Sequence, residues 1–299
     1  MPRRSRSRSQ SRSSTTSPSS TFFDKVRTGA LETRNGARLR GRELGGDYIQ
    51  SLERGLAAIR AFTGDRSALS VTEVAQRTGV SRAAARRILF TLSSLGYVGV
   101  TENGLYRLEP TVLTLGYAYI SGQDLPELAR TSMQDVAHEL NGSSSIGVLT
   151  GTDVTFIARV RAPGYLNTSL GVGSRLPAHL TAMGRVLLAD LTDEEIDGYF
   201  DRAPAPEAFT DRTVTDRGRL REAILEARET GYALVDQELV TGVRALAVAI
   251  RGRDGAAQAG LNVAVADTRR DANELLQTHL PVLQRAAASI STALASIVD

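Results

Sequence analysis

Apolar residues recur at helical intervals from Ile49 onward, where the chain first acquires a regular pattern. The spacing of three and four residues predicts an amphipathic helix that ends near Gly64 and Asp65. The periodic positions are Ile49, Leu52, Leu56, Ile59 and Phe62. A single apolar stripe on an otherwise polar helix indicates that this helix packs against a small core.

Start and stop signals predict two more helices directly afterwards. Ser70 with Glu73 three positions later is a capping-box signature, and Gly79 is a typical helix end. After a three-residue turn, Ser81 caps a further helix that Gly96 terminates. The two helices are therefore joined by a tight turn.

A β-hairpin is predicted after this helix pair, from YVGV, an Asn-Gly turn at 103–104 and LYRL. This element order is that of a winged helix-turn-helix, whose second helix enters the major groove of DNA. On that helix, one face is predicted to pack inward through Ala85, Ile88, Leu92 and Leu95. The predicted DNA-contacting residues are Ser70, Thr72, Ser81, Arg82, Ala84, Arg86 and Arg87. Arginine suits guanine edges and phosphates, although three arginines alone could also be a solvated helix face.

The remainder of the chain has a mixed pattern of helices and strands. Pro110 opens a helix, PTVLTLGYAYISG, that is too apolar for a free linker, so we expect it to pack on a partner, such as its own copy in a dimer. Further elements are a helix at 125–140, two strands within 143–160, helices at 181–191 and 216–230, a hairpin within 245–266 and a final helix from about Arg270. Strand pairs alternating with helices predict an α+β fold with one antiparallel sheet.

Charge is distributed unevenly along the 299 residues. Residues 1–45 carry eleven of the 36 basic residues and three of the 33 acidic ones, a net charge of +8, whereas the remainder is at −5. The first 20 residues lack an apolar pattern and are expected to be disordered, either as an arm that contacts phosphates or as an incidental tail. Without cysteine or a long apolar run, the chain is expected to have no disulfide and no transmembrane helix, and a cytoplasmic location is the simplest interpretation.

Several segments together resemble IclR-type transcriptional regulators. They include LERGLAAIRAF, LSVTEVAQRTGVSRAAARRILFTLSSLGYV, VGSRLPAHLTAMGRVLLA and GYALVDQELVTGVRALAVAIR. The segments SLERGL, SRAAARR and ALVDQEL are most similar to the branch that regulates aromatic-acid catabolism through the β-ketoadipate pathway. The resemblance implies a GAF-like C-terminal effector domain, a dimerising linker helix, and a homodimer or dimer of dimers on an operator in double-stranded DNA. The expected division is a disordered basic tail at 1–45, the winged helix-turn-helix at 46–108, the linker helix at 109–123 and the effector domain at 124–299.

The resemblance also implies an effector pocket between the region around 168–184 and the strands around 235–264. The matching residues are Leu176, Thr181, Met183, Asp236, Val243, Ala245, Asn262 and Ala264. The sequence departs from the family pattern in three places. Ala245 replaces a polar or sulfur-bearing residue, Val235 stands where a carboxylate is frequent, and Arg251-Gly252 replaces the usual aromatic-Asp ending of that motif. The expected ligand is a small carboxylated molecule, with glycine amides at 171, 173 and 184 approaching the anion.

An enzyme is the competing class, and the sequence disfavours it. The three histidines, His138, His179 and His279, lack the spacing of a metal site, and no nucleophile elbow or phosphate loop is present. Asp236 and Glu238 could form an acid–base pair, but the nearby Arg244 and Arg251 favour structural ion pairs. We therefore expect no catalytic residue, no metal and no cofactor. A DNA-packaging protein would explain the basic tail, but not a C-terminal domain with a ligand pocket.

Overall fold

The fold is described from a computed structural model, which describes residues 48–62, 68–120, 125–162, 170–266 and 271–296. The predicted tail at 1–45 lies outside these residues, and so does the end of the first predicted helix at Gly64 and Asp65. For 117–120 only the helical backbone is described.

The N-terminal elements form the predicted winged helix-turn-helix. They are α2 (Gln50–Arg60), β1 (Ala68–Leu69), α3 (Val71–Thr78), α4 (Arg82–Ser94), β2 (Val98–Val100) and β3 (Tyr106–Leu108). The capping box of Ser70 and Glu73 is present, and Gly79 ends α3 in the left-handed conformation, with φ of 69°. No sequence pattern predicted β1, which adds a third strand to the wing by pairing with β3.

The inward face of α4 differs from the predicted one. Ala85, Leu89 and Leu92 are its buried side chains, whereas Leu95 is 61% exposed and Ile88 only partly buried. The expectation that Leu95 packs inward is therefore wrong for the single chain. Leu89 lies four residues after Ala85, about one helical turn, and is therefore on the same face of α4. Leu95 lies beyond the last helical residue, Ser94.

Short helical segments connect this module to the rest of the chain. A 3₁₀ turn η1 (Pro110–Val112) leads into α5 (Leu113–Ile120), which confirms the helix predicted from Pro110. The helix predicted over 125–140 is observed as α6 (Leu125–Leu128) followed by α7 (Arg130–Glu139).

The C-terminal part contains one antiparallel sheet of six strands in the order β6-β5-β4-β9-β8-β7. The strands are β4 (Ser143–Thr150), β5 (Asp153–Val160), β6 (Arg175–Pro177), β7 (Tyr232–Asp236), β8 (Arg244–Arg251) and β9 (Ala257–Val265). The single antiparallel sheet and the two hairpins β4–β5 and β8–β9 confirm the α+β prediction.

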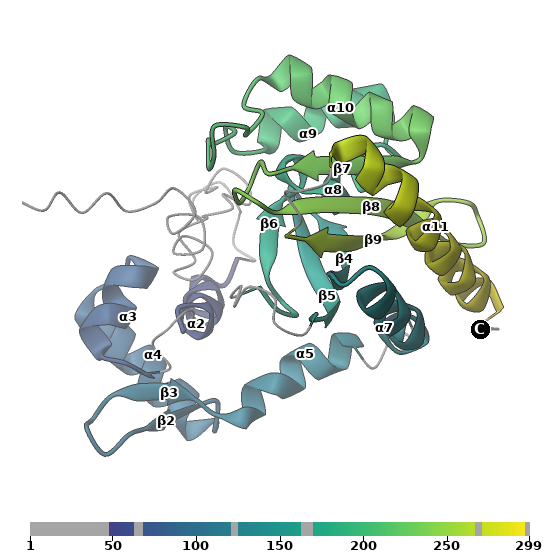
Figure 1. Ribbon diagram of the computed structural model, residues 1–299. Coiled ribbons are helices and arrows are strands. Elements are labelled where there is room, and N and C mark those ends of the chain that lie inside the picture. The colour runs from purple at the N-terminus through teal and green to yellow at the C-terminus, as the bar shows by residue number, and fades with distance from the viewer. Residues whose placement is uncertain (1–47, 63–67, 121–124, 163–169, 267–270, 297–299) are drawn as a thin grey trace, which may run out of the picture.

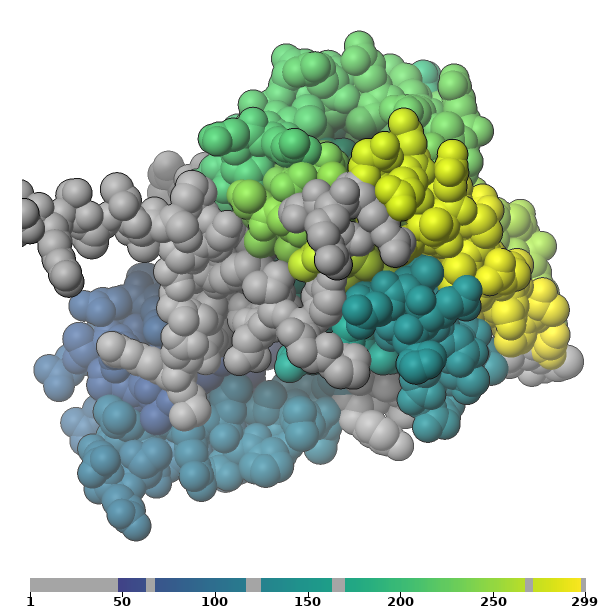
Figure 2. All heavy atoms as spheres, viewed as in Figure 1, coloured from purple at the N-terminus to yellow at the C-terminus, as the bar shows by residue number. Residues whose placement is uncertain are grey.

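Helices cover both faces of this sheet (Figure 1). One face packs against α8 (Ala182–Leu188), α9 (Asp193–Arg202) and α10 (Arg217–Thr230), and the other packs against α7 and the long α11 (Ala272–Ser296). The space-filling view shows α11 along the surface with α7 beside it (Figure 2). Two separate apolar cores result, one on each side of the strands.

Candidate DNA-binding and effector-binding sites

The predicted recognition helix presents its arginines to solvent. Arg82, Arg86 and Arg87 of α4 are all exposed, and the Ser81 hydroxyl accepts the Ala84 N–H at 3.2 Å and so caps the helix. Arg82 and Arg86 are four residues apart and therefore share one side of the helix. Phe90, which continues this side, is 71% exposed, and the sequence reasoning missed it although its spacing from Arg86 is the same.

The other predicted DNA contacts are not all on this side. Thr72 is exposed at the start of α3, while the Ser70 hydroxyl is engaged with Glu73 in the capping box. Ala84 instead lines a groove of about 700 Å³ between α2 and α4, together with Leu52 and Leu56. The structure thus brings Arg82 and Arg86 together on one side of α4, whereas Ala84 and Arg87 both line the groove against α2.

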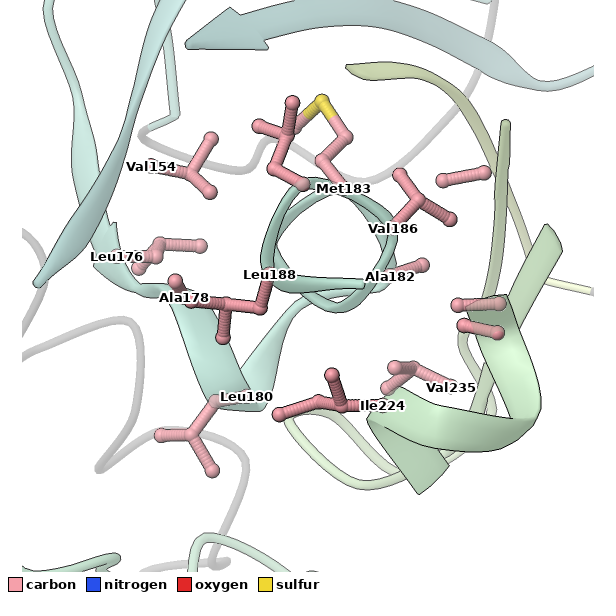
Figure 3. Packing of buried hydrophobic residues seen from close by; sticks show 14 of the residues in the cluster. Val154, Leu176, Ala178, Leu180, Ala182, Met183, Val186, Leu188, Ile224 and Val235 are labelled. Atoms are coloured by element: carbon pink, nitrogen blue, oxygen red, sulfur yellow. The ribbon is translucent and has the colours of Figure 1, made fainter. Parts of the chain in front are cut away.

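In the C-terminal part, the proposed pocket lies where α8 meets the sheet. Leu176 and Met183 are buried in the core around α8, which Figure 3 views along its axis. The Met183 side chain packs on Gly147 and Gly260, where an added Cβ would come within 3.3 Å and 3.0 Å of it. These two glycines let α8 approach the strands closely.

Short side chains continue on the same face of the strands beyond Met183. Ala245 and Ala264 are register partners across β8 and β9, and both are only partly buried, as is Val243. Asn262 is 8% exposed, and its Oδ1 atom has no hydrogen-bond partner. The sheet therefore offers a surface of small residues with one polar group whose acceptor is unsatisfied.

Two features expected to contact the ligand have structural partners instead. The Thr181 hydroxyl accepts the Gly184 N–H at 2.9 Å and caps α8. The amides of Gly171 and Gly173 donate to the Ser174 hydroxyl and the Phe156 carbonyl, respectively. The expectation that these three glycine amides face an anion is therefore wrong, because each already has an acceptor within the chain.

Asp236 and Glu238 form separate ion pairs, as the structural interpretation predicted. Asp236 contacts Arg212 at 2.6 Å and Arg244 at 2.5 Å. Burial opposes its ionisation, but hydrogen bonds from Arg244 and Gln237 hold the pKa of Asp236 below its ordinary value. Gln237 has a φ of 61°, so the strand ends before Glu238, and the two carboxylates do not share a strand face.

Arg251 is not the partner of either carboxylate. It pairs with Asp190 at 2.7 Å, and the partner of Glu238 is the buried Arg185. The sequence could not identify the Arg185–Glu238 pair, since the two residues come from distant segments.

His179 is buried beside α8, with 1% of its surface exposed. Its Nδ1 atom lies 2.6 Å from the Tyr199 hydroxyl, which also accepts the His179 backbone N–H. Burial, and secondly the charge of Arg185, lowers the pKa of His179 to about 4. The imidazole is thus held by a tyrosine hydroxyl, and its burial disfavours a contact with a ligand carboxylate.

Within the part of the chain that the structure describes, no group of three or more histidine and acidic side chains could hold a metal ion. A search of the same residues finds no helix with the length and apolar character needed to cross a membrane.

Comparison with known protein families identifies both parts of the chain. Residues 51–101 match the IclR helix-turn-helix domain, and residues 117–292 match the C-terminal domain of bacterial IclR transcriptional regulators. The chain belongs to the IclR family. As a family member it is a transcription regulator with a DNA-binding helix-turn-helix and a ligand-binding C-terminal domain. The matching families and relatives are regulators, not enzymes.

Two relatives of known name align with most of the chain. The Pca regulon regulatory protein of Pseudomonas putida is 39% identical over 81% of this chain and 82% of its own length. The p-hydroxybenzoate hydroxylase transcriptional activator of Acinetobacter baylyi is 35% identical over 81% of this chain and 90% of its own length.

Solved structures agree with this assignment. A transcriptional regulator from Rhodococcus sp. RHA1 superimposes with a TM-score of 0.73 at 39% identity, covering 84% of this chain and all of the other. An IclR homologue from Microbacterium hydrocarbonoxydans, solved with 4-hydroxybenzoate, has a TM-score of 0.71 over 83% of this chain and all of the other, at 23% identity, which supports the fold alone.

Proposed function

We propose that this IclR-family regulator controls genes of aromatic-acid catabolism, through the β-ketoadipate pathway, in response to a small carboxylated effector. The observation that carries the proposal is the 39% identity with the Pca regulon regulatory protein over 81% of the chain. A sensor of a small molecule from an unrelated pathway is the alternative. The two differ in which ligand changes operator affinity.

DNA recognition is assigned to the module at 46–108, which follows an expected basic tail at 1–45. Arg82, Arg86 and Arg87 would contact phosphates and base edges in the major groove, supported by their exposure on one helix. Ser70, Thr72, Ser81 and Ala84 complete the proposed contacts. Ala84 is the weakest member, because its methyl group lines the groove against α2 and, unlike Arg87 in the same lining, carries no charge or hydrogen-bonding group.

The effector is assigned to the domain at 124–299. The proposed contacts are Leu176, Thr181, Met183, Asp236, Val243, Ala245, Asn262 and Ala264. The partly exposed alanines and the unsatisfied Asn262 favour a ligand on this face of the sheet. The contribution of Asp236 and Thr181 would be indirect, since the carboxylate pairs with two arginines and the hydroxyl caps α8.

The working unit is proposed to be a homodimer or a dimer of dimers in the cytoplasm, with the linker at 109–123 as part of the interface. Leu113 of α5 is 73% exposed, and Leu115 lines the groove between α2 and α4. Exposed leucines on one helix beside an apolar groove favour burial against a second copy. Pairing would also double the DNA site and its specificity.

The effector proposal is tested by calorimetry of the full-length chain against protocatechuate, 4-hydroxybenzoate, muconate and β-ketoadipate. We expect at least one of them to bind and to change operator affinity in a gel-shift assay, because differential affinity for two states couples the sites. Binding of none would remove the pathway assignment. Sedimentation equilibrium at micromolar concentration tests the dimer, and a monomer with full operator affinity would contradict it.

A further inference from the structure

Three polar residues form one row across the central strands of the C-terminal sheet. Arg159 of β5 is the register partner of Ser145 on β4, and Ser145 is the register partner of Asn262 on β9. Directly opposed residues in antiparallel strands project from the same face of a sheet. The row continues to Ala247 of β8, which belongs to the core around α8, so the three polar side chains are on the α8 face.

The neighbours of this row differ on its two sides. Gly147 and Gly260 lie two positions along the strands from Ser145 and Asn262, and Met183 of α8 packs directly on both glycines. On the opposite side of the row, the next register pair is Ala264 with Ala245, and both are partly exposed. A ligand bound over the row would therefore contact the apolar Met183 on one side and the small side chains of Ala245 and Ala264 beneath it.

Arg159 provides a positive charge at one end of the row. Its Nη1 atom donates to the Ser145 hydroxyl at 3.1 Å, which holds the guanidinium over β4. Burial, and secondly the charge of Arg161, lowers the pKa of Arg159. Arginine keeps its proton in proteins, so a carboxylate at this position would offset the cost of burying the charge and the repulsion from Arg161. The planar guanidinium can bind such a carboxylate through two hydrogen bonds.

Asn262 provides a neutral hydrogen-bonding group on the next strand. Its Oδ1 atom is buried without a hydrogen-bond partner, which costs free energy unless a donor fills the position. Neighbouring strands are about 4.8 Å apart, so this acceptor lies roughly one strand spacing from the guanidinium over β4. One small molecule can span that separation if it carries an anionic group at one end and a hydroxyl at the other.

We propose that Arg159 binds the carboxylate of the effector and that Asn262 accepts a hydrogen bond from a hydroxyl of the same molecule, which makes the ligand class a hydroxy-substituted carboxylic acid. The proposal rests on the proposed function, because it assumes that this domain binds a carboxylated effector. It adds the residues that select the acid and the hydroxyl. Ser145 is a positioning residue in this arrangement, because it orients the guanidinium.

The carboxylate half is tested by calorimetry of the full-length chain with 4-hydroxybenzoate and its uncharged analogue 4-hydroxybenzamide. Wild type is expected to prefer the acid by at least tenfold, since hydrogen bonds to charged groups are the stronger ones. Arg159→Met should lose that preference, and Arg159→Lys should retain part of it. Arg219→Gln, which removes an exposed arginine from α10, is the matched control and should bind as wild type does.

The hydroxyl half is tested by comparing 4-hydroxybenzoate with benzoate. Wild type should prefer the hydroxy acid, and Asn262→Leu should abolish that preference while still binding benzoate. Circular dichroism and operator affinity report whether each variant is folded. If Arg159→Met does not fold, loss of the preference for acid over amide in Arg159→Gln supports the same conclusion.

The outcomes separate this inference from the proposed function. If wild type binds the acid and the folded Arg159 variants still prefer 4-hydroxybenzoate over 4-hydroxybenzamide as wild type does, the role of Arg159 is overturned. The proposed effector class then remains intact. Equal binding of benzoate and 4-hydroxybenzoate, or binding of muconate alone, would overturn the role of Asn262. If wild type binds no acid of the panel, both the effector class and the inference fail.

Discussion

Arg185 and Glu238 form a bidentate ion pair in the core, which joins α8 to the turn after β7. Nη1 and Nη2 of Arg185 donate to the two carboxylate oxygens at 2.8 and 2.7 Å, and both side chains are almost fully buried. Nε of Arg185 also donates to the His179 carbonyl, and the Val214 N–H donates to Glu238. The pair therefore connects α8, the loop before α10 and the strand edge that borders the proposed effector site.

Removing one partner of this pair should be strongly destabilising. Arg185→Met leaves the Glu238 carboxylate buried without its cation, and such losses cost about 3–5 kcal/mol. Urea denaturation monitored by circular dichroism measures the change in the free energy of unfolding.

The double variant Arg185→Met/Glu238→Leu should recover much of this loss, because a buried ion pair replaced by apolar residues is often neutral. A loss below about 1 kcal/mol for Arg185→Met alone would show that solvent reaches the pair, contrary to its burial.

The stability of the C-terminal domain should fall as the pH drops from 7 to 5 because of His179. Its pKa is lowered to about 4 in the folded chain, by burial first and by Arg185 second, whereas an unfolded histidine titrates near 6.5. Between these values the unfolded state binds a proton that the folded state does not, so stability decreases with falling pH. The expected loss is about 2 kcal/mol from pH 7 to pH 5.

Urea denaturation of wild type and His179→Gln at both pH values isolates this contribution. Glutamine does not titrate, so the variant should be less pH-dependent by about 2 kcal/mol, while all other groups affect both proteins alike. An identical pH dependence in the two proteins would mean that His179 titrates normally in the folded chain.

Operator binding should depend on the three exposed arginines of α4. The triple variant Arg82→Ala/Arg86→Ala/Arg87→Ala is expected to lose specific binding and to keep its fold, because all three side chains are exposed. Each arginine that contacts a phosphate should lower the slope of log K against log salt by about one. Fluorescence anisotropy with operator and random DNA at several salt concentrations measures both effects.

An exposed arginine outside the proposed interface is the control for this variant. Arg219→Ala on α10 should leave affinity and salt slope unchanged. Unchanged operator affinity of the triple variant at physiological salt would reject α4 as the recognition helix.

Local signals in the sequence predicted most of the fold correctly. Helix boundaries are set by contacts within a few residues, namely the capping box at Ser70, the cap at Ser81 and the left-handed glycines Gly79 and Gly231. Such signals depend little on the rest of the chain. By contrast, the strand β6 has only three residues, which is too few to show an alternation of apolar and polar positions. The helix α9 was not predicted, although Thr192 and Glu195 form a capping box at its start.

The chemistry of the candidate site was less predictable because it depends on pairs that are distant in sequence. Arg159 meets Ser145 only through the register of β4 and β5, which contains an irregularity between Ile146 and Gly147. The exposed and buried sides of α4 depend similarly on where α2 packs. Periodicity alone could not tell Leu89 from Leu95 as the residue that enters the core.

Gly184→Ala should destabilise the C-terminal domain, because α8 passes directly over a carbonyl at this position. A Cβ on Gly184 would lie 2.0 Å from the Ala178 oxygen, which is a backbone atom and cannot move independently. Forcing extra volume into a packed site costs about 1–3 kcal/mol or more. Gly198→Ala in α9 is the matched control, since its nearest neighbour would be the flexible Arg202 side chain at 3.4 Å. That substitution should stabilise the domain by about 0.5–1 kcal/mol, because alanine is the better helix former. Urea denaturation of both variants beside wild type tests the pair, and two shifts of the same sign would refute the close contact between α8 and the Ala178 carbonyl.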